Sequence, residues 1–479
     1  MRIHLAALAM LMLAPAAQAS NYVVSTTADS GAGSLRQAIL DSNAPAGGVH
    51  TMIFSAAFPN NGVILLDSNL PQIVSQSLII MGDSKRPSIS GKSLHALFSV
   101  STSTSVFELS DLVLKNAKAT EKGGCINSGN GSTAGQLRVE HVTFINCQAV
   151  GPSLITGGAI HWSRSSGTLT VIDSQFLDNA VTATASNGES SGGAIYTNAN
   201  VSIVRTLFDS NAAFATTGGG LGGAIALFGT QRNFSITEST FRLNAASPAA
   251  PLFGYGGAVY VYCDNCSTQI VRSYLRGNSA NFGGAVFARK SSDGGPSDVF
   301  LNLANSTFYN GSVLNIGGAV FVGSGASLSA SNNTFYNGDA SDGAHLGFTT
   351  SATVNYFRGN LLAPTYAGAA CSGTPTISNA TFVGFNVFSD ASCTSLNSGA
   401  LPNSPLGTVM VDERPGQIGV LRFSGSAVID SITNGTICEP RDARFQIRPI
   451  DGNGDGLAYC DVGAYEDPRD IIFINDFEA

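Results

Sequence analysis

Pairs of apolar residues separated by one polar position recur along the chain, and each pair is followed by a phenylalanine. The pairs are Leu169 and Val171, Val201 and Ile203, Phe234 and Ile236, and Leu301 and Leu303. A period of two buries both members on one face of a β-strand. The phenylalanine comes five residues after the second member, and an odd separation reverses the face of a continuous strand. The chain must therefore bend between them, at residues that are polar: Asp173, Arg205, Glu238, Arg272, Asn305 and Asn332.

Glycine doublets mark the start of each repeat. They begin at Gly123, Gly157, Gly192, Gly222, Gly256, Gly283 and Gly317, between 27 and 35 residues apart. Periods of this length are typical of solenoid proteins. Most doublets are followed by Ala and then Ile or Val, as at Ala159-Ile160. This pattern predicts that a new strand begins there.

An asparagine three residues after the phenylalanine predicts a second corner. It occurs at Asn179, Asn211 and Asn244, and Phe357 to Asn360 has the same form; in one unit Leu275 stands in place of the phenylalanine before Asn278. Gly311 and Gly338 occupy the place in two other units. Because Asn and Gly both accept the left-handed backbone conformation, we expect this residue to make the turn. Stacked Asn side chains are also expected to form a hydrogen-bonded ladder.

Each repeat is thus interpreted as three short strands separated by corners, which bury their apolar face only by stacking. The sequence predicts an all-β fold, a single-stranded right-handed parallel β-helix. A solenoid of helical hairpins is the competing architecture, but glycine doublets and β-branched pairs disfavour helices. Ser34 and Gln37 have the spacing of a capping box and predict a short helix that covers the N-terminal end.

Composition and charge narrow the class of protein. Gly is abundant at 55 residues, only 12% of residues are charged, and the net charge is −8. An acidic chain is not expected to bind nucleic acid. The apolar run Leu5 to Leu13 followed by Ala17-Gln18-Ala19 is typical of a cleaved secretory signal, and no later stretch is long enough to span a bilayer. We expect an exported monomer.

The domain organisation expected from these patterns has five parts. They are a signal peptide (1–19), an N-terminal cap with irregular first coils (20–122), regular β-helix repeats (123–395), a C-terminal anchor-like cap (396–467) and a tail (468–479). The tail is interpreted either as a sorting signal or as a simple chain end.

Eight cysteines in an exported chain favour disulfides between sequence neighbours. The expected pairs are Cys125 with Cys147, Cys371 with Cys393, Cys438 with Cys460, and Cys263 with Cys266. The first three pairs are each 22 residues apart, and the last is a CxxC. A redox motif is the other interpretation of the CxxC, although no βαβ pattern surrounds it.

Several segments resemble known bacterial exported proteins. Tyr22-Val-Val-Ser-Thr-Thr-Ala-Asp-Ser-Gly31 with Ser34-Leu35-Arg36-Gln37-Ala38 is similar to the CSLREA-type N-terminus, with Gly33 in place of its cysteine. The repeats resemble those of polymorphic outer-membrane proteins, and Cys460-Asp-Val-Gly-Ala-Tyr-Glu466 resembles the choice-of-anchor Q domain. The resemblance implies a pectate-lyase-like β-helix at a bacterial surface and an association with adhesion.

One outward column offers a candidate ligand-binding surface. The residue after the phenylalanine is expected to point outward, and successive coils place there Asp209, Arg242, Arg276, Tyr309, Tyr336 and Arg358. Arg and Tyr in a row suit an acidic or neutral polysaccharide, through bidentate hydrogen bonds and ring stacking. The alternative is an ordinary solvated face. His161-Trp162 is similarly either a surface platform for a sugar or a structural pair.

An acidic turn is the candidate metal site. Asp451, Asn453 and Asp455 alternate with glycines as at the start of an EF-hand loop, and Asp461 is the candidate for the missing late ligand. The interpretations are a structural calcium site or a plain Asp/Gly turn. No polygalacturonase or pectate lyase signature is present. Glycan binding or adhesion is therefore the first hypothesis, a polysaccharide lyase or glycosidase the second, and a passive surface protein the third.

Overall fold

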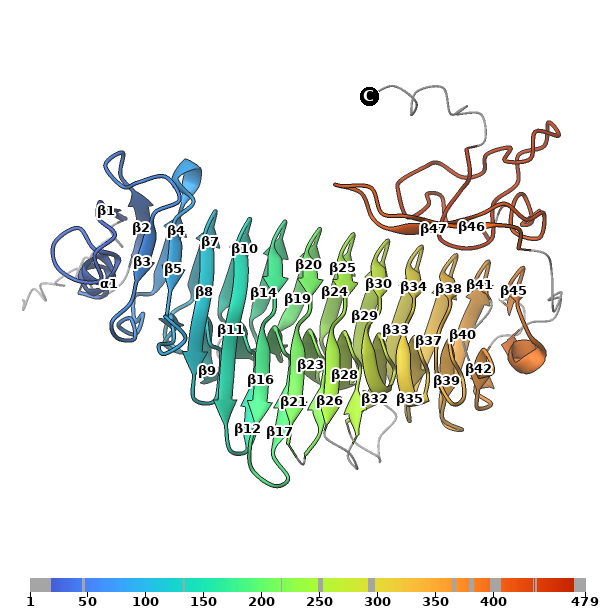
Figure 1. The fold of residues 1–479 in the computed structure, drawn as a ribbon, viewed down its shortest axis with the longest axis horizontal. Helices are drawn as coiled ribbons and strands as arrows, with labels where there is room; N and C mark the ends of the chain where they lie inside the picture. Colours follow the sequence, from blue (N-terminus) through green and yellow to red (C-terminus); the bar gives the residue numbers. More distant parts are fainter. Residues whose placement is uncertain are drawn as a thin grey trace, which may run out of the picture.

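The computed structural model describes residues 19–468, apart from 45–47, 132–133, 217, 249–252, 292–297, 364–367, 379–382, 397–405, 434 and 436. The expected signal peptide, up to residue 18, and the tail from residue 469 lie outside the described residues. The chain forms the predicted parallel β-helix, with strands stacked in register coil after coil (Figure 1).

The first sheet joins strands from almost every coil. In spatial order it contains β1 (Ser20–Val24), β2 (Val49–Phe54), β4 (Ser77–Met81), β7 (Val106–Ser110), β10 (Gln136–Glu140), β14 (Thr168–Ile172), β19 (Asn200–Val204), β24 (Asn233–Thr237), β29 (Cys266–Val271), β33 (Val299–Ala304), β37 (Ala326–Ser331), β40 (Thr353–Arg358) and β43 (Thr376–Ile377). β44 (Val383–Gly384) also pairs with β40.

Most strands of the second sheet begin just after a glycine doublet. It contains β6 (Phe98–Ser99), β9 (Ile126–Gly131), β13 (Ile160–Arg164), β18 (Ile195–Thr197), β23 (Ile225–Thr230), β28 (Val259–Asp264), β32 (Val286–Lys290), β36 (Val320–Val322), β39 (Leu346–Phe348) and β42 (Cys371–Ser372).

The third sheet is bent and has three strips. The first strip contains β3 (Val63–Leu65), β5 (Ser88–Ser90), β8 (Val113–Ala119), β11 (Thr143–Gly151), β15 (Gln175–Leu177), β20 (Leu207–Asp209), β25 (Thr240–Arg242), β30 (Tyr274–Arg276), β34 (Thr307–Tyr309), β38 (Thr334–Tyr336), β41 (Leu361–Leu362) and β45 (Val387–Phe388). The second contains β16 (Ala180–Ala183), β21 (Ala212–Ala215), β26 (Ala245–Pro248), β31 (Ser279–Phe282) and β35 (Ser312–Ile316). The third contains β12 (Leu154–Thr156), β17 (Glu189–Ser191), β22 (Gly220–Leu221) and β27 (Gly254–Tyr255).

The apolar pairs and the phenylalanines face one continuous core, as the alternation predicts. Leu169, Val171 and Phe176 are all fully buried. Phenylalanines of successive coils stack face to face, and the ring centroids of Phe144 and Phe176 are 4.5 Å apart. The bend that the odd spacing requires lies at Asp173, which has a φ of 49°. The equivalent residues of the next coils are also left-handed: Arg205, Glu238, Arg272, Asn305 and Asn332.

The corner asparagines form the predicted ladder but do not make the turn. Asn179, Asn211, Asn244 and Asn278 are fully buried, and each of the first three donates its Nδ2 to the Oδ1 of the next at 2.9 Å. The left-handed residue is the one before, as at Asp178 with a φ of 54°. The expected role of the asparagine was therefore wrong, because its amide is needed inside the stack.

Gly311 and Gly338 are not left-handed either; Asn310 and Asn337 before them are. A Cβ at Gly311 would lie 2.2 Å from the carbonyl oxygen of Gly318, and one at Gly338 would lie 2.1 Å from that of Ala344. Glycine occupies this place because the neighbouring backbone leaves no room for a side chain. The ladder therefore ends at Asn278.

The N-terminal helix α1 (Leu35–Asn43) lies at the predicted end of the solenoid (Figure 1). Ser34 accepts a hydrogen bond from the Gln37 backbone N–H at 3.2 Å, as expected of the cap. The Gln37 side chain instead donates to Asp41, so the capping box is only half formed. The other short helices among the described residues are η1 (Asp83–Lys85) and η3 (Ala391–Leu396). No helix among the described residues has the length and apolarity to cross a membrane.

Three of the four expected disulfides are present. They join Cys125 to Cys147, Cys371 to Cys393, and Cys438 to Cys460. Cys263 and Cys266 are instead buried free thiols, so the structure contradicts the fourth expected pair. Cys263 is the penultimate residue of β28 and Cys266 begins β29, on either side of a turn through left-handed Asn265.

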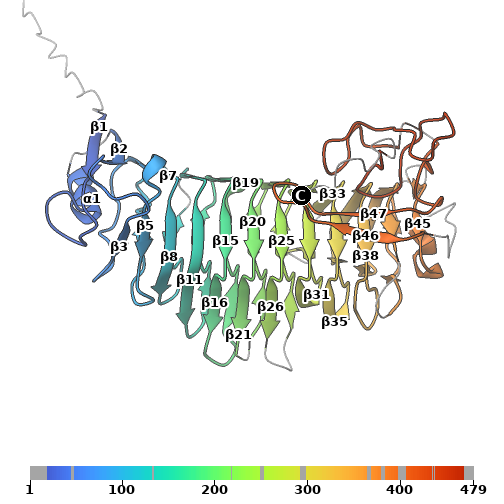
Figure 2. The same ribbon diagram turned by 45° about the horizontal axis from the view of Figure 1, so that its top comes forward.

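The C-terminal domain, defined here as described residues 406–468, does not close the far end of the solenoid. It lies along the side of the later coils, above β30 to β41 in the view of Figure 1, and Figure 2 shows it from a second direction. Its only described strands are β46 (Val409–Asp412) and β47 (Val420–Phe423), which pair antiparallel.

Candidate functional site

The outward column predicted from the repeat exists over five coils. Asp209 pairs in register with Arg242, Arg242 with Arg276, Arg276 with Tyr309, and Tyr309 with Tyr336. These residues end β20, β25, β30, β34 and β38 and stack along the solenoid axis. The geometric part of the prediction is therefore confirmed for them.

Arg358 does not belong to this column. It pairs with Ser331 in the first sheet, whereas Phe335 of the phenylalanine column pairs with Leu362. The motif Phe357 to Asn360 has the same residue pattern as the repeat, but Phe357 lies in β40 of the first sheet and not in the third sheet. Asn360 accordingly joins a second ladder, at the other corner, between Asn333 and Asn386.

The C-terminal domain covers the later part of the column. Tyr309 and Tyr336 pack against the apolar cluster that contains Leu421 and Phe423. The ring centroids of Tyr336 and Phe423 are 6.1 Å apart at an angle of 81°. These tyrosines are therefore docking contacts within the chain, and their rings are partly buried by the domain.

Polar contacts fix the same interface. The Nη1 of Arg276 donates to both carboxylate oxygens of Glu413 at 2.8 Å, and the Tyr274 hydroxyl donates to Glu413 at 2.5 Å. Burial, and then the hydrogen bond to Glu413, raises the pKa of Tyr274. Tyr274 therefore stays protonated and donates its hydrogen bond. Glu413 is thus the residue whose hydrogen bonds attach the domain to β30.

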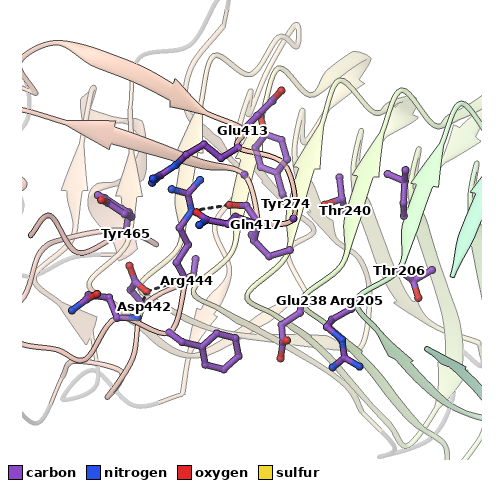
Figure 3. A pocket seen from close by; sticks show the side chains of 18 of the residues that line it. Arg205, Thr206, Glu238, Thr240, Tyr274, Glu413, Gln417, Asp442, Arg444 and Tyr465 are labelled. Carbon is purple, nitrogen blue, oxygen red and sulfur yellow. Dashed lines mark hydrogen bonds between the residues drawn. The ribbon is translucent and has the colours of Figure 1, made fainter. Parts of the chain in front are cut away.

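A cavity of about 910 Å³ lies beside this contact, where the domain meets the earlier coils. Figure 3 shows Arg205, Glu238 and Thr240 on the solenoid side and Gln417 and Arg444 on the domain side. Cavities of this size are typical of small-ligand sites. The cavity is the candidate functional site of the described chain.

On the solenoid side of the cavity, the corner residues Asp173, Arg205, Glu238 and Arg272 alternate in sign and form ion pairs between coils. Arg205 donates Nε and Nη2 to the two oxygens of Asp173 at 2.7 Å, and Arg272 lies 3.4 Å from Glu238. The hydrogen bond from Arg205 lowers the pKa of Asp173. Left-handed backbone at each corner turns the chain sharply and leaves these side chains on the outside.

The domain side is a polar loop held by several hydrogen bonds. Arg444 donates to Asp412 Oδ2 at 2.6 Å and to the Asp412 carbonyl at 2.8 Å. Burial alone would raise the pKa of Asp412, but hydrogen bonds and charge from Arg444 and Arg414 outweigh it and lower the pKa to about 2. Asp442 in turn accepts the backbone N–H groups of Arg444 and Gln446, each at 2.8 Å.

Phe445 lies between these two residues at the edge of the cavity. It has a φ of 66° and is 44% exposed. The guanidinium of Arg272 lies over its ring, 4.5 Å from the centroid. A bulky residue in this backbone region is a genuine outlier and is often found at functional sites.

The acidic turn is well formed but stands apart from Asp461. Asp451 accepts the N–H groups of Gly454 and Gly456, and Asn453 and Asp455 each accept one further N–H of the turn. Both carboxylate oxygens of Asp461 are used elsewhere, by the N–H groups of Asp430 and Asp467. Among the described residues, no three His, Cys, Asp or Glu side chains are grouped to hold a metal. A calcium site at the acidic turn stays a prediction.

The motif ending in Glu466 has a structural role in the domain core. Glu466 is fully buried, 3.3 Å from Arg448, and accepts the N–H groups of Ile450 and Asp461. Burial, and then the charge of Glu466, raises the pKa of Asp461, and burial likewise raises that of Glu466. These groups hold three segments of the domain together.

The interpretation of His161-Trp162 as a surface platform is wrong. Trp162 is fully buried in the core, and His161 stacks on Tyr196 with centroids 5.1 Å apart. Rings continue outside the second sheet, and Phe287 and Phe321 are parallel within 2°. Because the rings that stack this way present their faces to one another, they leave mainly edges for any ligand.

The repeat pattern carries no signal for the domain side of the cavity. Gln417, Arg444 and Phe445 lie in irregular loops with no recurring motif. Only the alternating charges of the corner residues gave a signal for the solenoid side. No protein-family model and no curated protein matches the chain.

Proposed function

We propose that the chain is an exported monomer of a bacterial surface or its medium that binds a glycan in the cavity between solenoid and C-terminal domain. The observation that carries this proposal is the composition of a cavity of about 910 Å³. Carboxylate, guanidinium and amide groups line it together with Tyr465 and Phe445. Planar polar groups form paired hydrogen bonds with sugar hydroxyls, and rings stack on the apolar face of the sugar.

The proposal changes the expected binding surface. Arg242 lines the cavity while paired with Asp209 at 2.7 Å, and the later members of the column pack against the domain. The corner residues Arg205 and Glu238 line the cavity beside it. The export and bacterial origin rest on the signal-like N-terminus and on the resemblance described above.

The test is direct binding to a panel of soluble polysaccharides and to a glycan array, with the whole mature chain. Arg205→Met removes one cavity side chain, and Arg138→Met removes a comparable exposed arginine that pairs with Glu140 on β10, outside the cavity lining. Exposed pairs contribute little to stability, so both variants are expected to fold. We expect several-fold weaker binding for the first variant alone.

Three results would overturn the proposal. Equal binding by both variants would place the glycan elsewhere. Release of unsaturated or reducing sugars from a bound polysaccharide would make the chain a lyase or a glycosidase. Absence of binding across the panel would favour the passive structural role.

A further inference from the structure

The charges of the cavity walls are nearly balanced. Four arginines and five carboxylates line the cavity: Arg205, Arg242, Arg414, Arg444, Asp173, Glu238, Glu413, Asp442 and Glu466. A site for a polyanionic sugar needs a cationic excess, which steers and retains the ligand. The cavity has no such excess.

Each of these arginines is also engaged by a carboxylate of the chain. The shortest nitrogen–oxygen distances are 2.7 Å for Arg205 with Asp173, 2.7 Å for Arg242 with Asp209, and 2.6 Å for Arg444 with Asp412. Arg414 lies 2.9 Å from Asp412. A uronate carboxylate would have to displace one of these partners and leave it beside a new negative charge.

Phe445 supplies an apolar surface in the same cavity. Arg272 covers one side of its ring, and the side chain is nevertheless 44% exposed. The two N–H groups held by Asp442 flank Phe445 and fix the turn that presents it. Phe445 has a φ of 66°, a backbone conformation that bulky residues rarely adopt.

We propose that the cavity binds an uncharged glycan, with one sugar ring stacked on the exposed side of Phe445 and its hydroxyls hydrogen-bonded to the paired charges of the walls. This inference rests on the proposed function and narrows its ligand class. Arg272 is a positioning residue here, because its guanidinium packs on one face of the Phe445 ring and is ion-paired with Glu238.

The experiment compares neutral glucans, mannans and galactans with polygalacturonate and alginate at low and at high salt. Phe445→Ala removes the ring, Phe445→Trp keeps an aromatic face, and Phe300→Ala removes a ring that is 39% exposed on β33, outside the cavity lining. We expect neutral glycans to bind best, with affinity almost independent of salt. Phe445→Ala should weaken binding about tenfold, and Phe445→Trp should retain it.

The outcomes separate the inference from the function beneath it. Neutral binding that Phe445→Ala leaves unchanged overturns the stacking role but keeps the cavity as a glycan site if Arg205→Met still weakens it. Preferential, salt-sensitive binding of a uronate polymer overturns the ligand class. Binding of no glycan by the unmodified chain overturns both. Circular dichroism of each variant shows whether a loss of binding reflects a loss of fold.

Discussion

Replacing Asn244 by alanine tests whether the buried ladder stabilises the solenoid. Asn244 Oδ1 accepts from the backbone N–H of Asn211 at 3.0 Å and from its Nδ2 at 2.9 Å. Its own Nδ2 donates to the Phe208 carbonyl at 3.0 Å and to Asn278 Oδ1 at 2.9 Å. The substitution removes these four hydrogen bonds at a fully buried place.

The expected cost is large because the former partners stay buried. Two donors on Asn211 and two acceptor oxygens lose a partner, and a buried polar group left unsatisfied costs about 1–3 kcal/mol. Relaxation and partial sharing reduce the sum, so we expect the free energy of unfolding to fall by about 3–5 kcal/mol. Urea unfolding can be followed by the fluorescence of Trp162, the single tryptophan of the chain, which is fully buried.

Two further variants make this prediction specific. Asn302→Ala removes an asparagine from the outward side of β33 and should cost less than about 1 kcal/mol, as surface changes do. Asn244→Asp keeps the shape but directs a carboxylate oxygen at two acceptors, and it should recover stability on acidification. A loss for Asn244→Ala that is no larger than that of Asn302→Ala would refute the role assigned to the ladder.

Four other predictions concern the C-terminal domain and the thiols. The raised pKa values of Asp461 and Glu466 mean that the folded domain binds more protons than the unfolded one. Their contribution to stability is therefore present below about pH 4 and lost as pH rises. The melting temperature of the domain should be higher at about pH 5 than at about pH 7, and a lower value at about pH 5 would contradict this. Breaking the Cys438–Cys460 disulfide, which closes a loop of 22 residues, should lower the free energy of unfolding by about 3 kcal/mol. In the unmodified protein, alkylation under denaturing conditions should label the two thiols of Cys263 and Cys266, and no labelling would show that they form a disulfide. A calcium site at the acidic turn predicts a lower melting temperature in a chelator, and an unchanged temperature would count against it.

The fold was predictable because each coil repeats the same physical requirement. Leu169 and Val171 are two residues apart and lie on one face of a strand, whereas Phe176 comes five residues later. Because five is odd, the chain must bend to bury all three. The same reasoning assigned the wrong residue to the second corner. Asparagine is compatible both with left-handed backbone and with a ladder, and sequence alone does not show that Asp178 turns while Asn179 bonds.

The candidate site was only half predictable. Register along the solenoid follows from the repeat, so the column from Asp209 to Tyr336 was found. Its coverage depends on contacts such as Arg276 with Glu413, which are 137 residues apart and carry no periodic signal. The misplaced Arg358 has a similar origin, since Phe357 to Asn360 copies a motif while occupying a different strand.

The ladder also makes the length of the molecule adjustable. Each inner asparagine accepts a hydrogen bond from the asparagine of the coil before it and donates one to the asparagine of the coil after it. A duplicated repeat of 33 residues between Asn211 and Asn244 would therefore meet neighbours that already fit it. Each such insertion would move the N-terminal end about 4.8 Å further from the docked domain. Because Arg205 and Glu238 lie on the two sides of this insertion point, the added repeat would lengthen the solenoid and also change which corner residues line the cavity.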